Sequence, residues 1–293
     1  MNSEKKRLIV IDANSIIHRA FHALPPLTTK KGVEVGAVYG FLLVFFKAIK
    51  DFQPDFVAAC FDFPGPTFRH EKFKEYKAKR PPAAQELYEQ IPKVKEVLAA
   101  FNVSVFEKEG FEADDIIGTI ASKAPQKQVV PEIETIILSG DKDTLLLVNK
   151  NTKVYSLRKG VKDIVLYDEA EVEKKYGLTP KQLLDYKALR GDPSDNIPGV
   201  KGIGEKTATD LLSKFGSLEH IYENISQVPQ KLKEKLLEQK EQALLSRELA
   251  SINKNVPVEF NLKDCQWGKY DKSKTTQALK DLEFFSLINR LPD

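Results

Sequence analysis

Apolar runs and helical spacings alternate along the first 170 residues of the chain. Five apolar runs of strand length lie at residues 8–11, 56–61, 134–138, 154–157 and 164–167. Between them, apolar residues recur every three to four positions, as on one face of a helix, at Leu87, Ile91, Val94, Leu98 and Phe101. Apolar strands separated by helices are typical of a parallel sheet that is covered on both faces. We therefore predict an α/β fold with a mostly parallel sheet flanked by helices.

The strand pattern ends near residue 176, and helical signals replace it. Thr179 and Pro180 form an N-cap and a first-turn proline, which predicts a helix over 181–189. Further helices are expected over 206–215, where Gly216 follows as a C-terminal cap, and over 241–252. The two domains that we expect, one α/β and one mainly helical, cover residues 1–175 and 176–293.

Composition indicates an ordinary globular protein. Of the 293 residues, 42% are hydrophobic and 30% are charged. Cys60 and Cys265 are too few and too far apart for a disulfide framework or a thiolate zinc site, so we expect reduced thiols in a cytoplasmic protein. The apolar runs at 8–11 and 41–46 are too short for a signal peptide or a membrane span, so we expect no membrane partner. The net charge of +3 gives little indication of a nucleic-acid partner by itself.

Aspartates stand at the ends of three predicted strands, at Asp12, Asp62 and Asp141. In open parallel sheets, ligands bind beyond the carboxyl ends of the strands, so these side chains are expected to meet. Asp143 follows two residues after the third of them. Two more acidic clusters lie at the start of a predicted helix and in a later loop, namely Glu112, Asp114 and Asp115, and Asp192 and Asp195.

These nine carboxylates, with no histidine or cysteine in any cluster, favour a hard cation. All-oxygen ligand sets of high charge suit Mg²⁺ or Mn²⁺ rather than zinc. Nine acids exceed the needs of one such ion, and two ions about 4 Å apart form the clamp used in phosphoryl transfer. A single strand-end aspartate is more often a turn or cap residue, but burying several like charges together is costly without cations.

A basic and aromatic segment follows the Asp62 strand end. Residues 69–80 include six Lys or Arg and two Glu. If the segment is helical, the residues that share one face are Phe73, Tyr76, Lys77 and Arg80. Rings that stack on bases beside cations that contact phosphates suit a single strand, with Lys72 as a further contact. The alternative is a solvated charged helix.

Residues 199–207 form a glycine-rich turn that leads into a predicted helix. Glycines let backbone amides approach a ligand, and the helix N-terminus behind them favours phosphate. The turn departs from a P-loop because Glu205 follows the last glycine, and from the dinucleotide fingerprint because Thr207 replaces the third. A turn that binds the DNA backbone fits better, and a plain helix–helix turn is the alternative. The expected DNA contacts are Gly199, Lys201, Gly202, Gly204, Lys206 and Thr207.

Together these motifs resemble the 5′-nuclease (flap endonuclease) superfamily, and within it the 5′–3′ exonuclease domains of bacterial DNA polymerase I. The likeness covers nearly the whole chain. The matching segments are residues 11–14, 19–22, 37–41, 61–62, 68–71, 75–77, 112–115, 139–143, 191–199 and 202–207, together with Arg80. Pro193 and the stretch 124–132, with Pro125 and Pro131, depart from the family pattern.

The resemblance implies a site with two Mg²⁺ or Mn²⁺ ions. The acids implied for the first metal are Asp12, Asp62, Glu112, Asp114 and Asp115. The acids implied for the second are Asp141, Asp143, Asp192 and Asp195. The catalytic residues would be Lys77, which would stabilise transition-state charge, and Arg80, which would position the strand. The implied DNA contacts near the scissile phosphate also include Arg19, Arg69 and Tyr76.

The resemblance also implies a fold, an activity and partners. The expected fold is a PIN-like or resolvase-like domain with a helical arch over about residues 66–100, joined to a helix–hairpin–helix-like domain that holds a K⁺. Such a protein removes 5′ flaps or short 5′ pieces in replication and repair, as a 5′–3′ exonuclease and flap endonuclease. Its partners would be flapped, nicked or gapped DNA, RNA primer strands, and a DNA polymerase in cis or in trans. We expect a monomer in the bacterial cytoplasm, associated with the nucleoid.

Three other functions fit parts of the sequence. A PIN-like nuclease that uses one metal or acts on RNA would keep the strand-end acids but would not need the glycine turn. A branched-DNA binder without catalysis is the second, and the nine acids argue against it. A phosphatase with an aspartyl nucleophile needs Asp-x-Asp after the first strand, where this chain has Asn14.

Overall fold

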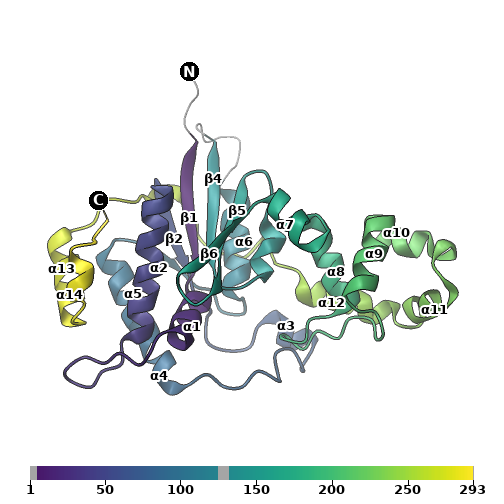
Figure 1. Cartoon of the computed structure of the whole chain (residues 1–293), viewed down its shortest axis with the longest axis horizontal. Coiled ribbons are helices and arrows are strands. Elements are labelled where there is room, and N and C mark those ends of the chain that lie inside the picture. The colour runs from purple at the N-terminus through teal and green to yellow at the C-terminus, as the bar shows by residue number, and fades with distance from the viewer. Residues whose placement is uncertain (1–4, 125–131, 293) are drawn as a thin grey trace.

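The computed structural model describes residues 5–124 and 132–292, so most of the unusual stretch 124–132 lies outside the described residues. A six-stranded sheet stands at the centre of the N-terminal part, in the order β3–β2–β1–β4–β5–β6 (Figure 1). The strands are β1 (Lys6–Asp12), β2 (Phe56–Cys60), β3 (Ser104–Phe106), β4 (Ile133–Ser139), β5 (Thr152–Lys159) and β6 (Asp163–Tyr167). Among these strands four neighbouring pairs are parallel and β6 runs antiparallel to β5, which confirms the predicted mostly parallel sheet.

Successive residues of the central strands belong to two different hydrophobic cores. In β1, Leu8 and Val10 join the core on one face, whereas Ile9 and Ile11 join the core on the other. The helices that contribute to the Ile9 core include α1 (Ala13–Ala23), α2 (Gly36–Phe52) and α5 (Gln90–Ala100), and α6 (Ala113–Lys123) contributes to the Leu8 core. Because both faces of the sheet are covered, every position of β1 between Leu8 and Ile11 is fully buried.

The later part of the chain is helical, as predicted. Its α-helices are α7 (Glu169–Tyr176), α8 (Leu183–Arg190), α9 (Glu205–Phe215), α10 (Leu218–Glu223), α11 (Gln230–Glu238) and α12 (Lys240–Ala250). A short 3₁₀ turn, Pro180–Gln182, precedes α8, and the Gln182 side chain accepts a hydrogen bond from the Thr179 N–H at 3.0 Å. Leu189 and Leu212 belong to the same core cluster as Leu8, so this helical part is continuous with one face of the sheet.

The last helices return to the N-terminal part of the structure. The helices α13 (Lys272–Asp281) and α14 (Phe285–Ile288) lie beside α5 at one end of the molecule (Figure 1). The Thr275 hydroxyl donates to the Ala100 carbonyl at 2.8 Å, and the Trp267 ring stacks on Phe101. From the sequence we expected the helical domain to extend to residue 293. In the structure these last helices pack on the α/β part.

The basic segment is not the continuous helix that its spacing predicted. Only α3 (Phe68–Lys72) and α4 (Gln85–Tyr88) are helical between residues 66 and 89, and residues 73–84 join them without helical structure. Lys77 has a left-handed φ of 55°, and its N–H donates to the Asp195 carbonyl at 2.9 Å instead of to a helical partner. Pro81 and Pro82 also lack the N–H that a helix needs. The predicted shared helical face is therefore absent from these described residues, and the expected arch over about 66–100 contains three separate helices, α3, α4 and α5.

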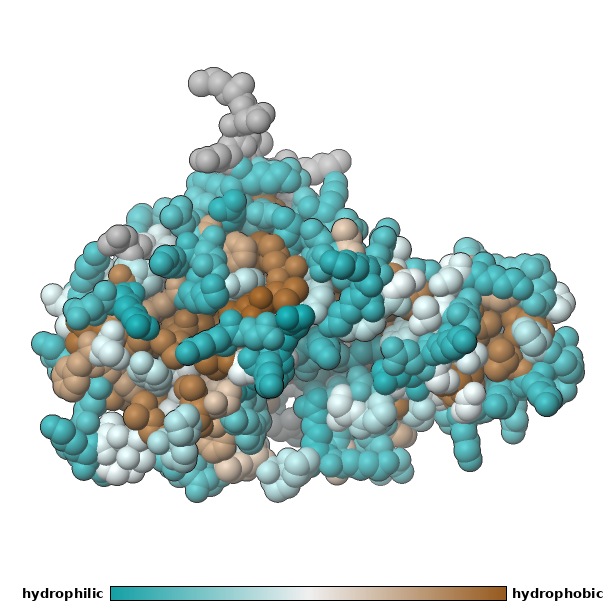
Figure 2. Space-filling model, viewed as in Figure 1, coloured by the Kyte–Doolittle hydropathy of each residue, from teal (hydrophilic) through white to brown (hydrophobic). Residues whose placement is uncertain are grey.

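The visible surface is mostly polar. Figure 2 shows hydrophilic residues spread over both the sheet-containing and the helical halves, with apolar residues showing as separate areas between them. Within the described ranges, 5–124 and 132–292, the structure has no helix that is both long and apolar enough to cross a bilayer.

Two glycines close the loop that carries Asp192 and Asp195. Gly191 and Gly199 have φ values of 78° and 64°, and a Cβ added to Gly199 would lie 2.2 Å from the Gly191 nitrogen. Between them, Asp192 and Ile197 exchange backbone hydrogen bonds, each at 2.9 Å. The loop is thus fixed by direct backbone contact, which only residues without a Cβ allow.

We expect Gly199→Ala to lower the free energy of unfolding by about 2 kcal/mol or more, because a steric clash adds to left-handed strain. Gly32→Ala is the matched control, since Gly32 has a φ of 77° but open space around its Cβ position. The control should lose only about 1 kcal/mol. Urea unfolding measures both changes, and equal losses would show that the Gly191–Gly199 contact is not a constraint.

Candidate active site

Three adjacent strands bring three aspartates to one edge of the sheet. Asp12 is the last residue of β1, while Asp62 and Asp141 follow the neighbouring strands β2 and β4. The Asp12 carboxylate accepts hydrogen bonds from the Ser139 hydroxyl at 2.6 Å and from the Ser15 N–H at 3.2 Å, where it caps α1. The Asp62 carboxylate accepts from the Ala113 N–H at 2.8 Å, which ties it to the start of α6.

A cavity of about 890 Å³ opens at this edge. Seven of the nine predicted acids line it, namely Asp12, Asp62, Glu112, Asp114, Asp141, Asp143 and Asp192. Basic side chains line it as well, namely Arg19, Lys77, Arg80, Lys142, Lys175, Lys187 and Arg190. The cavity therefore combines oxygen donors that could hold cations with cationic groups that could contact phosphate.

Burial raises the pKa of several of these acids above the usual range. Burial, opposed by serine hydrogen bonds but reinforced by nearby carboxylates, raises the pKa of Asp12 to about 6. Burial also raises the pKa of Asp143 to about 6, and burial with the Asp12 and Asp141 charges raises the pKa of Asp114 well above its usual range. A bound cation would favour the ionised carboxylates, so the donor set fits a hard divalent ion.

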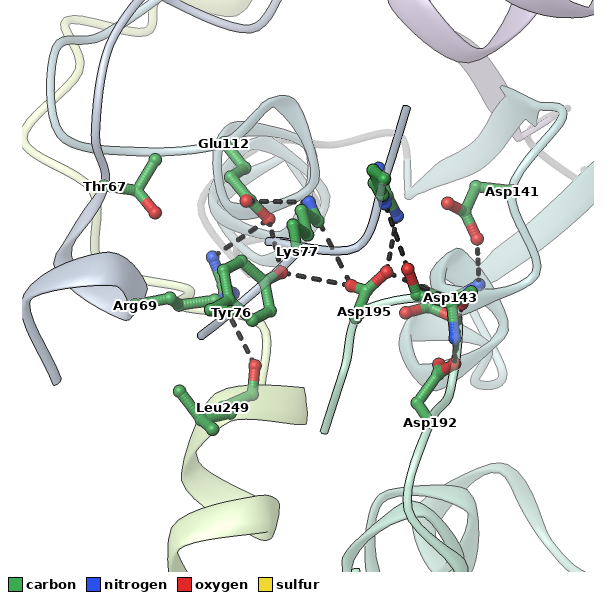
Figure 3. Close-up of polar contacts among 12 residues, drawn as sticks. Thr67, Arg69, Tyr76, Lys77, Glu112, Asp141, Asp143, Asp192, Asp195 and Leu249 are labelled. Carbon is green, nitrogen blue, oxygen red and sulfur yellow. Dashed lines mark hydrogen bonds and ion pairs between the residues drawn. The ribbon is translucent and has the colours of Figure 1, made fainter. Parts of the chain in front are cut away.

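Three of the acids that line the cavity are paired with lysines, namely Glu112, Asp143 and Asp192. Within residues 5–124 and 132–292, the structure has no cluster of three or more acids, histidines or cysteines arranged to hold a metal ion. The Lys77 ammonium lies 2.7 Å from a Glu112 oxygen (Figure 3), and the Lys187 ammonium lies between Asp143 and Asp192. In this arrangement, the two lysines neutralise the negative charge of these three carboxylates.

Asp115 and Arg69 form a buried ion pair outside the cavity. Asp115 is fully buried, and both of its oxygens accept from the Arg69 guanidinium at 2.8 Å. Each oxygen accepts a second bond, one from the Asn253 N–H at 2.8 Å and the other from the Glu112 N–H at 3.2 Å. The expectation of Asp115 as a metal ligand is not supported, because its lone pairs are already used inside the protein.

Arg69 is likewise placed for folding and not for contact with DNA. Its side chain is only 3% exposed, and it donates to the carbonyls of Leu249 at 3.0 Å and Ser251 at 2.7 Å. Figure 3 shows it reaching towards Leu249 at the end of α12. The predicted DNA contact is therefore corrected: Arg69 joins α6 to the end of α12.

Tyr76 is also buried, at 3% exposure, so its ring is not available to stack on a base. Its hydroxyl lies 3.1 Å from oxygens of both Glu112 and Asp195. Burial and those two carboxylates raise the pKa of Tyr76, which keeps the phenol neutral. The predicted stacking role is thus not supported, and Tyr76 instead links two acidic segments (Figure 3).

Asp195 is held by the turn that carries Lys77 and Arg80. It is buried and does not line the cavity, and the Arg80 guanidinium contacts its carboxylate. The same turn and loop are also joined by the Arg80 Nε, which donates to the Ser194 carbonyl at 3.2 Å, and by the Asn196 amide, which donates to the Glu75 carbonyl at 2.7 Å. The structure therefore places Asp195 as a connection between the two parts of the chain.

The remaining predicted DNA contacts lie in different places. Arg19 lines the cavity and donates to the Gly140 carbonyl at 3.1 Å, whereas Lys72 is exposed and contacts Glu248 on α12. In the glycine turn, the Gly199 N–H donates to the buried Ser246 hydroxyl at 3.0 Å, so that glycine is structural. The other residues of the turn are placed at the start of α9 or just before it, namely Lys201, Gly202, Gly204, Lys206 and Thr207.

Comparison with known protein families places these features in context. The model of the 5′–3′ exonuclease N-terminal resolvase-like domain matches residues 7–177, and that of the 5′–3′ exonuclease C-terminal SAM fold matches residues 178–273. The chain belongs to the 5′–3′ exonuclease family. The resemblance that the motifs indicated is confirmed, and so are the resolvase-like fold and the assignment as a nuclease.

Relatives of the exonuclease include DNA polymerases. DNA polymerase I of Bacillus subtilis is 45% identical over 290 residues, which cover 99% of this chain and 32% of the relative. DNA polymerase I of Caldicellulosiruptor bescii is 43% identical over 97% of this chain and 33% of its own length. The exonuclease chain thus spans about a third of the length of the curated relatives it matches.

Solved structures share the fold of the exonuclease at low sequence identity. The T5 5′-exonuclease with bound zinc has a TM-score of 0.69 and 19% identity, with 96% of this chain and 100% of that chain covered. The catalytic core of Rad2 in complex with DNA substrate has a TM-score of 0.62 and 18% identity, with 99% and 94% covered. At these identities the likeness shows the fold alone.

Several cavity residues were not predicted by the sequence analysis, among them two histidines and Lys187. His18 and His22 line the cavity from α1, although no histidine was expected among the acids. Their i, i+4 spacing on a helix that begins directly after Asp12 could have indicated this. Lys187 lies five residues before Asp192, and a lysine so close to an acidic loop was the available signal.

We expect Arg69→Ala to destabilise the exonuclease by about 3–5 kcal/mol, because it leaves Asp115 buried without a counter-charge. Arg158→Ala is the matched control, since Arg158 forms an exposed ion pair with Asp163 and its loss should cost less than about 0.5 kcal/mol. Chemical unfolding followed by circular dichroism measures both. A stable Arg69→Ala protein that binds DNA weakly would restore Arg69 as a DNA contact.

Proposed function

We propose that this exonuclease hydrolyses DNA phosphodiesters near junctions of single- and double-stranded DNA, as a 5′–3′ exonuclease and flap endonuclease with two Mg²⁺ or Mn²⁺ ions. The observation that carries the proposal is the cavity in which seven of the predicted acids and seven basic side chains face the same space. Divalent ions held there would supply Lewis-acid stabilisation at the phosphate and a more acidic water. Two proteins that share this fold, the T5 5′-exonuclease and the Rad2 catalytic core, have been solved with divalent metal ions and with DNA substrate, respectively.

The chain's own residues would divide the work. Asp12, Asp62, Glu112 and Asp114 would hold one ion, and Asp141, Asp143 and Asp192 would hold the other. Lys77 and Arg80 reach the cavity from the turn after α3, where they would stabilise negative charge on the reacting phosphate. Arg19, on α1 beside the Asp141 strand end, would contact a neighbouring phosphate.

The substrate would be a DNA with a 5′ flap, a nick or a gap, or an RNA primer strand on DNA. We infer that the duplex lies along residues 201–207, where α9 begins with Gly204 as its N-cap, with a K⁺ at the turn. A monomer, with a DNA polymerase joined in cis or acting in trans, would serve replication and repair in the bacterial nucleoid, as the polymerase relatives suggest.

We expect the wild-type chain to release a short labelled product from a 5′-labelled flap DNA in Mg²⁺ and none in EDTA. Asp141→Ala should lower the cleavage rate by about 100-fold or more while DNA binding in EDTA stays within a few-fold. Asp163→Ala, which removes an exposed acid at the start of β6, is the matched control and should cut normally. Tight binding without any cleavage by the wild type would favour the branched-DNA binder instead.

We expect Lys77→Ala to reduce the single-turnover cleavage rate by about 100-fold with little change in DNA affinity, because its charge would matter mainly in the transition state. Lys74→Ala removes the same charge from an exposed position of the same turn and should leave the rate within about 2-fold. Rapid-quench kinetics at saturating enzyme measures both rates. Equal effects of the two variants would assign Lys77 a general electrostatic role only.

A further inference from the structure

Lys187 occupies the space between two predicted ligands of the second metal. It projects from α8, and its ammonium lies 2.8 Å from an Asp192 oxygen and in contact with an Asp143 oxygen. The side chain is 16% exposed, and all three residues line the same cavity. One ammonium therefore neutralises two carboxylates that reach it from different parts of the chain.

The two carboxylates come from segments that Lys187 brings together. Asp143 begins a 3₁₀ helix (Asp143–Leu147) after β4, and Asp192 belongs to the loop closed by Gly191 and Gly199. Asp141 lies two residues before Asp143 and adds further negative charge. Without a positive charge between them, these acids would repel one another in a partly buried space.

A divalent ion that binds Asp143 and Asp192 must use the oxygens that now contact the ammonium. The ion and the ammonium would also repel each other at that distance. We propose that Lys187 is the resident counter-ion of the second carboxylate pair, that a divalent ion binds there only by displacing it, and that the displaced ammonium then contacts substrate phosphate in the cavity. This inference rests on the proposed two-metal function.

Lys187 is then a positioning residue that weakens metal binding at the second site. In the absence of DNA, the second ion must compete with an attached cation, so the second site is weaker than its carboxylates alone would make it. A phosphate in the cavity would offer the displaced ammonium a new partner and would therefore favour the ion. Metal occupancy and substrate binding become linked through one side chain.

The test is a titration of the DNA-free chain with Mn²⁺, with bound ions counted by electron paramagnetic resonance and calorimetry. Lys187→Met keeps most of the volume and removes the charge, and it should tighten the weaker Mn²⁺ site by at least about 10-fold. Lys175→Met is the matched control, because Lys175 lines the same cavity but donates to the Tyr167 hydroxyl at 2.7 Å. The control should leave both Mn²⁺ affinities within about 2-fold.

A second variant tests whether the effect of Lys187→Met comes from loss of charge and not from loss of folding. Lys187→Gln removes the charge but keeps a hydrogen-bond donor to an aspartate, and it should tighten the weaker site in the same direction. Thermal unfolding gives an independent measurement, since saturating Mn²⁺ should raise the Tm of both Lys187 variants more than that of the wild type.

The outcomes of the Mn²⁺ titration distinguish a failure of the Lys187 proposal from a failure of the two-metal function. If the wild type binds two Mn²⁺ and the Lys187 variants bind the weaker one no more tightly, the counter-ion proposal is overturned and the two-metal function stands. If the wild type binds no Mn²⁺, or only one ion with or without DNA, the two-metal function itself fails. Tighter binding in the Lys187 variants together with an unchanged control supports both.

Discussion

Crowding of like charges at one edge of a parallel sheet is the constraint on which this structure depends. Aspartates end or closely follow three neighbouring strands, and the start of α6 adds Glu112 and Asp114 to the same cavity. Burial there raises the pKa of Asp12 and Asp143 to about 6, so the ionised state needs compensation. In the described structure Lys187 contacts Asp143 and Lys77 contacts Glu112, and divalent ions would supply further positive charge in the proposed enzyme. Helix α8 and the turn after α3 place these two lysines beside the acids.

Much of this could be predicted because the signals are local. The apolar run of β1 follows from a sheet covered on both faces, and a strand-end aspartate at Asp12 is visible directly in the sequence. Helix α9 is bounded by glycines at both ends, which marked it clearly. β3 was missed because it has only three residues, all half-buried, which give no apolar run.

The contacts that sequence reasoning could not supply are those between distant segments. Arg69 appeared to be one member of a basic run, but its partners are Asp115 on α6 and the carbonyls at the end of α12. Lys77 is not helical as expected, because the backbone carbonyl of Asp195, more than a hundred residues later, accepts its N–H. Spacing along one segment predicts which side chains share a face only when the partner is on the same segment.

The bond from Arg69 to Leu249 also sets the order in which this site can be completed during biosynthesis. The two residues are 180 positions apart, and domains begin to fold while the ribosome still extends the chain. A nascent chain that has not reached Leu249 lacks both carbonyl acceptors of Arg69 and the Asn253 amide that supports Asp115. The sheet can therefore form early, but the contacts that position Glu112 and Lys77 form late. A chain still on the ribosome thus carries the acids of a nuclease before it has the geometry to cut.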